Sequence, residues 1–151
     1  MQKKTRTPCV GICSTTYGDE VCRGCKRFYF EVINWNKYDE DEKEAIWTRL
    51  ESLKTQIIYS KIKKINSKIL STKIAELDLK IKTDLNEYCQ IFDLIKLVSE
   101  SFEDLSDFGI TFHDESTNLE ILKRDLEEEL LALSDAHYSK YFKDPLEQKK
   151  A

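Results

Sequence analysis

Apolar residues recur at helical spacing along most of the chain, and this periodicity predicts a mostly helical protein. After Asp39, one stripe with steps of four, three and four residues comprises Ile46, Leu50, Leu53 and Ile57. A neighbouring stripe with the same steps comprises Ile58, Ile62, Ile65 and Ile69. Such spacing places the apolar side chains on one side of a helix. We therefore predict a helix over about 40–66, with Asp39 as its N-cap.

Three other segments also have helical spacing. They are 28–35, 85–105 and 118–142. Asp84 is the predicted N-cap of the second of these helices, and Thr117 or Asn118 that of the third, because short polar side chains accept hydrogen bonds from the first amides of a helix. The sequence has neither glycine nor proline between residues 26 and 108, which favours long helices.

Residues 75–82 have two interpretations. From Ala75 onward, apolar and polar residues alternate, which is the period of a half-buried strand. The same region also continues a helical stripe made of Leu70, Ile74, Leu77 and Ile81. A second alternating piece spans 109–113. We favour a small two-stranded element formed by 75–82 and 109–113, and the helical alternative stays open.

Length and composition are those of a folded globular protein. The chain has 151 residues, of which 40% are hydrophobic and 34% are charged, which suffices for one ordinary core beneath a charged surface. No apolar run approaches the roughly 20 residues that cross a bilayer. The basic N-terminus is followed by Thr7-Pro8-Cys9, where a signal peptide would need an apolar stretch. We therefore expect a cytoplasmic protein.

Four of the five cysteines lie close together near the N-terminus. They are Cys9, Cys13, Cys22 and Cys25, in the pattern C-x3-C, eight residues, C-x2-C. Two close pairs joined by a short loop can place four thiolates around one centre, and Gly11 and Gly24 inside the pairs let backbone amides approach the sulfurs. In a reducing compartment such a cluster is more often metal-bound or redox-active than disulfide-bonded. We therefore predict a four-cysteine metal knot, and we expect the fifth cysteine, Cys89, to be a buried thiol.

The spacing of the cysteines leaves the identity of the metal open. Four-sulfur sites suit either zinc or an iron–sulfur cluster, and we favour zinc. Because four cysteine ligands leave no open coordination position, we expect a structural centre rather than a hydrolytic one. Arg23, Lys26 and Arg27 are placed to offset the negative charge of four thiolates.

The segment around the cysteines resembles a known family. The residues that carry the resemblance are 7–13, 21–27, Glu31, Trp35, Arg49 and Leu50. They look like the P-C-x3-C, C-x-G-C-x-R, glutamate, tryptophan and R-L pattern of the bacterial domain-of-unknown-function family 1289, whose members are described as predicted iron–sulfur proteins. The resemblance covers about residues 7–50 and implies four cysteine ligands, with no established activity. Residues 133–142 resemble the C-terminal extension of longer members.

Charge is divided unevenly along the chain, whose net charge is −4. Residues 1–68 carry 14 basic and 9 acidic residues, whereas residues 69–151 carry 10 and 19. Arg23, Lys26 and Arg27 are therefore candidate contacts for RNA phosphates or for a protein partner. Further basic candidates are Lys3, Lys4, Arg6, Lys61, Lys63, Lys64 and Lys68. A solvated helix face explains the second group equally well, and the acidic C-terminal half favours a partner with a basic surface.

Outside the cysteines the sequence offers little for catalysis. The chain has two histidines, His113 and His137, and we interpret both as structural or surface residues. Residues 113–115, His-Asp-Glu, have the residue types of acid–base chemistry or of a second metal site. Trp35 and Trp47 are expected to pack the knot onto the helix that follows, because large aromatic side chains dominate small cores.

These features predict a mostly α fold with a small β element, in which the four-cysteine metal knot precedes a helical body. We divide the chain into a metal-binding module at 1–50, a helical body with the two-stranded element at 51–143, and a disordered tail at 144–151. The expected function is that of an adaptor rather than an enzyme, in which the structural knot engages a protein or RNA complex. An iron–sulfur protein for electron transfer or redox sensing and an RNA-associated factor are the alternatives.

Overall fold

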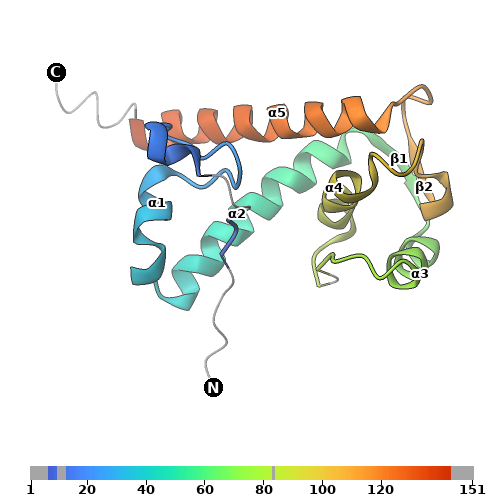
Figure 1. Ribbon diagram of the computed structural model, residues 1–151, viewed down its shortest axis with the longest axis horizontal. Coiled ribbons are helices and arrows are strands. Elements are labelled where there is room, and N and C mark those ends of the chain that lie inside the picture. The colour runs from blue at the N-terminus through green and yellow to red at the C-terminus, as the bar shows by residue number, and fades with distance from the viewer. Residues whose placement is uncertain (1–6, 10–12, 83, 144–151) are drawn as a thin grey trace. The chain divides into compact units, whose positions relative to one another are not determined.

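Helices make up most of the computed structural model, which describes residues 7–9, 13–82 and 84–143 (Figure 1). The α-helices are α1 (Tyr29–Asn34), α2 (Glu40–Tyr59), α3 (Ser67–Glu76), α4 (Glu87–Val98) and α5 (Leu119–Tyr138). The strands are β1 (Ile62–Ile65) and β2 (Ile110–Phe112). The short helical turns are η1 (Ser14–Tyr17), η2 (Trp35–Lys37), η3 (Ser106–Phe108) and η4 (Ser139–Lys143). The predicted mostly α class with a small β element is confirmed, and the tail predicted to be disordered, 144–151, lies outside the described residues.

The chain forms two compact units, each with buried residues of its own. Unit 1 comprises Met1–Leu53 together with Leu130–Ala151, and unit 2 comprises Lys54–Glu129. Unit 1 therefore joins the cysteine segment to the end of α5, which the spacing of residues along the chain does not predict. None of the helices in the described part of the chain is long and apolar enough to span a membrane.

The helix predicted over 40–66 begins where expected but ends at Tyr59. Asp39 caps it as predicted: its Oδ1 accepts the Glu42 amide at 2.8 Å, and Glu42 Oε1 accepts the Asp39 amide at 3.3 Å. Beyond Tyr59 the chain forms β1 instead, and Asn66 then starts α3, where its side chain accepts the Ile69 amide at 3.2 Å. The spacing of these isoleucines is compatible with one long helix and also with a helix followed by a strand and a second helix. Periodicity alone therefore placed the end of the helix too late.

The two-stranded element is present, but the prediction of its first strand at 75–82 is wrong. β2 lies inside the predicted range 109–113 and pairs antiparallel with β1. The paired residues are Ile62↔Phe112, Lys64↔Thr111 and Ile65↔Ile110. The helical alternative holds for the start of the 75–82 stretch, because α3 continues to Glu76 with Leu70 and Ile74 buried.

The remaining helices agree with their predicted segments and differ at their ends. α1 lies within 28–35. α4 begins after Asn86, whose Oδ1 accepts the Cys89 amide at 2.9 Å, and not after Asp84. It ends at Val98, short of the predicted 105. α5 begins after Asn118, whose Oδ1 accepts the Ile121 amide at 3.1 Å, which confirms one of the two predicted caps.

The end of α5 completes the core of unit 1 (Figure 1). Phe28, which is fully buried, forms one cluster with Val21 and Tyr138. The Phe28 ring centroid lies 5.4 Å from that of Tyr138 and 5.2 Å from that of Phe142, in edge-on arrangements that aromatic pairs favour. The segment that follows the cysteines is therefore covered by residues that come from the far end of the chain.

Gly109 supplies a test of how tightly unit 2 is packed. Its φ is +75°, and an added Cβ would lie 2.9 Å from Asn66 Cβ. Gly18 in unit 1 has a φ of +99° but nothing within 4 Å of such a Cβ. The left-handed conformation costs an alanine about 1–2 kcal/mol at either site. We predict that Gly109→Ala lowers the free energy of unfolding of unit 2 by more than Gly18→Ala lowers that of unit 1, measured by hydrogen exchange in urea. Equal losses would contradict the close contact with Asn66.

Candidate metal centre

Cys22 and Cys25 lie on a tight turn in unit 1. The Lys26 amide donates to the Cys22 carbonyl at 2.8 Å, and the Cys22 amide donates to the Arg27 carbonyl at 2.9 Å. Lys26 follows the second thiol in the left-handed region, with a φ of 66°. Its Nζ donates back to the carbonyls of Arg23 at 2.6 Å and Gly24 at 3.0 Å. The side chain of Lys26 therefore satisfies the carbonyls of the turn that carries both cysteines.

The turn is tied to the loop that carries Cys13. The residue after Cys13, Ser14, accepts the Arg23 amide on its hydroxyl at 2.8 Å. The Ser14 amide donates to the thiol of Cys22, as do the amides of Gly24 and Cys25. Burial by itself would raise the pKa of Cys22, but these hydrogen bonds outweigh it and lower the pKa to about 7. Three backbone amides thus converge on one sulfur from both loops.

The thiols of Cys13 and Cys25 also have donors beside them. Cys13 Sγ lies 3.0 Å from Thr15 Oγ1, and this contact lowers the pKa of Cys13. Arg27 Nε donates to Cys25 Sγ at 3.2 Å in a buried setting. Burial raises the pKa of Cys25, and the Arg27 contacts oppose that rise. Ser14 and Thr15 had no assigned role in the sequence prediction, although short polar residues directly after a cysteine are suited to this contact.

The three basic residues predicted near the cysteines have different environments. Lys26 and Arg27 are buried, with 1% and 3% of their surface exposed, whereas the side chain of Arg23 is 72% exposed. Buried cations require compensating negative charge or hydrogen bonds, and those of Lys26 and Arg27 face the cysteine turn. Arg27 contacts the Cys25 sulfur, whereas the Lys26 ammonium group is bound by backbone carbonyls, and the role of offsetting thiolate charge stays a prediction.

Cys22 and Cys25 share one turn, the loop of Cys13 is hydrogen-bonded to that turn through Ser14, and Cys9 is exposed. Gly11, predicted to loosen the first cysteine turn, lies outside the described residues. Among residues 7–9, 13–82 and 84–143, no group of three or more His, Cys, Asp or Glu side chains is arranged to hold a metal ion. The donors around the sulfurs nevertheless suit thiolates, because amide, hydroxyl and guanidinium groups stabilise the anionic form that binds metals.

A buried ion pair joins the turn to the helices that follow. Glu31 Oε1 accepts the Phe28 amide at 2.8 Å, which caps α1. The same carboxylate receives two hydrogen bonds from Arg49 on α2, at 2.6 and 2.7 Å. The Arg49 guanidinium also lies 4.0 Å from the centroid of the Phe28 ring. Glu31 and Arg49 thus connect α1 to α2 within unit 1.

Both tryptophans pack as predicted. Trp35 is buried in a cluster with Ile46 and Leu50 of α2, against which Trp47 also packs. The guanidinium of Arg27 lies 4.9 Å from the Trp35 ring centroid, which links this cluster to the cysteine turn. The tryptophans therefore connect the cysteine segment to α2.

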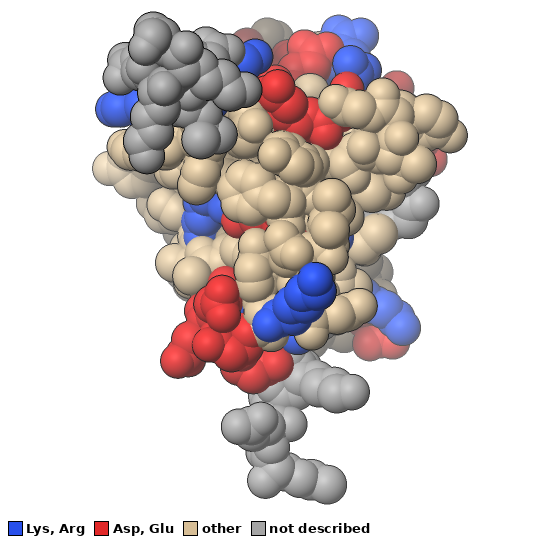
Figure 2. All heavy atoms as spheres, turned by 90° about the vertical axis from the view of Figure 1, so that its left-hand side faces the viewer, with Lys and Arg blue, Asp and Glu red and all other residues tan. Residues whose placement is uncertain are grey.

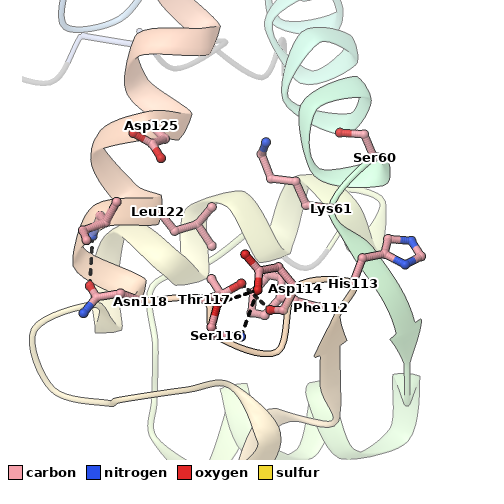
Figure 3. A pocket seen from close by; sticks show the side chains of 11 residues that line it. Ser60, Lys61, Phe112, His113, Asp114, Ser116, Thr117, Asn118, Leu122 and Asp125 are labelled. Carbon is pink, nitrogen blue, oxygen red and sulfur yellow. Dashed lines mark hydrogen bonds between the residues drawn. The ribbon is translucent and has the colours of Figure 1, made fainter.

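Residues 113–115 do not form an acid–base pair. They lie beside a cavity of about 430 Å³ in unit 2, where the His113 ring points away from the other labelled side chains (Figure 3). Asp114 Oδ1 accepts the amide and hydroxyl of Ser116 at 3.0 and 2.6 Å, contacts that lower the pKa of Asp114. Asp114 therefore stabilises its own turn, in agreement with the structural interpretation of these residues.

The other sequence candidates are the fifth cysteine and the further basic residues. Cys89 is fully buried in α4, as predicted. In unit 2, Lys61 Nζ pairs with Glu129 Oε1 at 2.8 Å, while Lys63, Lys64 and Lys68 are exposed. Lys3, Lys4 and Arg6 lie outside the described residues. The basic residues proposed as one RNA-binding set are therefore divided between two units.

Comparison with protein families identifies the cysteine segment. Residues 7–54 match the model of a family described as "Protein of unknown function (DUF1289)". The matched range contains the four clustered cysteines and the Glu31–Arg49 pair. Searches of the curated proteins and of the solved structures find no match.

Removing either partner of the Glu31–Arg49 pair should strongly destabilise unit 1. Loss of one member of a buried ion pair costs about 3–5 kcal/mol, because it strands the other charge. We predict such a loss for Arg49→Met and Glu31→Gln in urea titrations followed by tryptophan fluorescence, since both tryptophans lie in unit 1. The control is Arg23→Met, whose pair with Asp19 is exposed and worth about 0–1 kcal/mol. Losses as small as the control would contradict the role assigned to the pair.

The stability of unit 1 should also depend on His137. Its ring centroid lies 6.1 Å from that of Phe28 and 4.7 Å from that of Tyr141. Burial and the charge of Arg49 lower the pKa of His137 from 6.5; Lys140 adds to the shift and Glu31 opposes it. Because the pKa of His137 is lower in the folded protein, the unfolded chain binds the proton more readily. The free energy of unfolding therefore falls as the pH drops below about 6.5. We predict this fall in urea titrations and a smaller one for His137→Gln; an identical pH dependence in the variant would disprove it.

Proposed function

We propose that the chain is a metal-binding adaptor whose Cys9, Cys13, Cys22 and Cys25 hold one structural metal centre. The observation that carries the proposal is the set of hydrogen-bond donors directed at the sulfurs. The Cys22 thiol receives amides from both cysteine loops, and Cys25 receives the Arg27 guanidinium. Such donors stabilise thiolates, and clustered thiolates are the ligand set that zinc and iron–sulfur clusters use.

Zinc is the metal that we favour for this centre. When bound by four thiolates it would cross-link the two loops, and structural zinc sites contribute apparent folding free energies of about 10–16 kcal/mol. The loops themselves contain little apolar material, so such a contribution would matter here. An iron–sulfur cluster for electron transfer or redox sensing is the alternative, since it uses the same ligands.

A binding role suits the proposed centre better than a catalytic one. Four cysteine ligands leave no position at which a substrate or a water molecule can coordinate the metal. The residue types noted for acid–base chemistry serve another purpose, because Asp114 stabilises a turn in unit 2. The module would instead act as a rigid, metal-stapled platform that engages a protein complex.

RNA is a weaker candidate than protein as the partner of this platform. Of the three basic residues beside the cysteines that could meet phosphates, Lys26 and Arg27 are buried and only the Arg23 side chain is largely exposed. A buried cation cannot neutralise a phosphate at the surface, and phosphate contacts supply most non-specific RNA affinity. The burial of these side chains therefore supports a protein partner.

Elemental analysis with an absorption spectrum tests the centre directly. We expect protein purified without oxygen to be colourless and to carry one equivalent of zinc, and Cys22→Ser to lose it. Cys89→Ser is the matched control, because Cys89 is a buried thiol of unit 2 outside the proposed ligand set. A brown protein with visible charge-transfer absorption would show that the centre is an iron–sulfur cluster and not zinc. Protein without stoichiometric metal, or metal retained in Cys22→Ser, would rule out the centre.

A further inference from the structure

Large apolar side chains remain exposed where α1 lies beside the chain end that follows α5. The exposed fractions are 70% for Ile33, 55% for Tyr141, 40% for Tyr29 and 36% for Phe142. Monomeric proteins rarely expose such side chains in one place, and a contiguous group of them marks an interaction surface. The group lies entirely within unit 1, together with the proposed metal centre.

These side chains form a continuous surface. The ring centroids of Tyr29 and Phe30 are 5.5 Å apart, and those of Phe30 and Phe142 are 5.1 Å apart. Ile33 lies one helical turn beyond Tyr29 on α1 and three residues beyond Phe30, so it extends the same side of the helix. We call the surface made by Tyr29, Phe30, Ile33 and Phe142 the apolar face. Figure 2, which views this side of the molecule, shows a broad uncharged area.

Acidic residues border one edge of the apolar face. The Glu20 carbonyl accepts the Tyr29 amide at 2.8 Å, so Glu20 is a direct neighbour of the face. Asp19 and Glu20 lie close enough to Asp135 that, together with its burial, they raise the pKa of that carboxyl group. Asp19 pairs with Arg23 at 3.4 Å and Glu20 pairs with Lys143 at 3.7 Å, and Lys140 Nζ lies 5.3 Å from the Tyr141 ring centroid.

A second acidic group follows α1 along the chain. The first turn of α2 contains Glu40, Asp41 and Glu42, and Lys43 pairs with Glu40 at 3.7 Å. In Figure 2 acidic side chains lie above and below the uncharged area, and basic side chains lie at its borders as well. The apolar face is therefore framed by a negative excess, and a partner with positive charge would gain from it.

We propose that the apolar face is a docking surface for a basic amphipathic helix of a partner protein. The inference rests on the proposed adaptor function and names the chemistry of its partner. A helix is the suitable shape, because the face is built from a helix and the chain that continues from α5, with no strand pairing among its residues. Apolar side chains of the partner helix would cover Ile33 and Tyr29, and its basic residues would meet the acidic edges.

Fluorescence anisotropy with two synthetic peptides tests the docking surface. The basic probe is a labelled helix of about 18 residues with leucine at positions i, i+3, i+4 and i+7 and lysine elsewhere. The acidic probe carries glutamate in place of lysine. We expect the basic probe to bind the full chain, the acidic probe to bind at least about tenfold more weakly, and added salt to weaken the basic complex.

The variant Ile33→Asp separates apolar docking from general charge attraction. Aspartate adds a negative charge that would by itself attract the basic probe, so a loss of binding by about tenfold identifies the apolar contact. Ile33 is 70% exposed, so its replacement should leave the fold intact, as circular dichroism will show. Leu97→Asp is the matched control, because Leu97 is a 50% exposed apolar residue in unit 2. We expect it to bind the basic probe as the unmodified chain does.

Several results would overturn the docking proposal. Equal affinity for both probes, or equal loss of binding in Ile33→Asp and Leu97→Asp, excludes a specific basic partner. Self-association that Ile33→Asp abolishes in sedimentation would assign the face to a second copy of the chain, and tighter binding of an RNA oligonucleotide at the same face would assign it to nucleic acid. Metal content is measured on the same samples: metal-loaded protein that does not bind the probe refutes only the docking surface, whereas metal-free protein that binds it refutes only the metal centre.

Discussion

The shared carboxylate of Glu31 is the contact on which the N-terminal module depends. One oxygen accepts the Phe28 amide and so starts α1, while both oxygens receive the guanidinium of Arg49 on α2. Because a bidentate pair fixes the relative orientation of its two groups, it sets how α1 meets α2 within unit 1. Phe28 follows the cysteine turn by only a few residues, so the same carboxylate also determines where the chain leaves that turn.

Charge balance explains why the module buries so many cations. Lys26 and Arg27 are buried beneath the cysteine turn and Arg49 is largely buried, yet Glu31 is the one buried carboxylate among the described residues. The aromatic faces of Phe28 and Trp35 offset part of the excess. Thiolates at the cysteine turn would offset the remainder, as the Arg27–Cys25 contact illustrates. Buried positive charge thus favours the anionic form of the sulfurs at this turn.

Local signals in the sequence predicted much of this arrangement. Features that depend on contacts between distant parts of the chain could not be predicted. The capping residues Asp39 and Asn118 start helices as predicted, because a cap acts within one turn. The first strand was misplaced because β1 is selected by its pairing with β2, which lies more than forty residues further along the chain. At the candidate site, cysteine spacing supplied the proposed ligands, a prediction that metal analysis has to test. The spacing could not reveal the donors Ser14 and Thr15 or the burial of Lys26, since these depend on how the two loops meet.

The contacts of Phe28 show that the family segment is not a self-sufficient unit in this protein. The family matches residues 7–54, yet the Phe28 ring packs on His137, Tyr138 and Phe142, which lie far outside that range. Without them the largest apolar side chain beside the cysteine turn would face water, at a cost of about 1.5–3 kcal/mol. The chain end that follows α5 therefore has two roles in unit 1. Its buried side completes the core beside the cysteine turn, and Phe142 also belongs to the apolar face, so the core and the proposed docking surface share a residue.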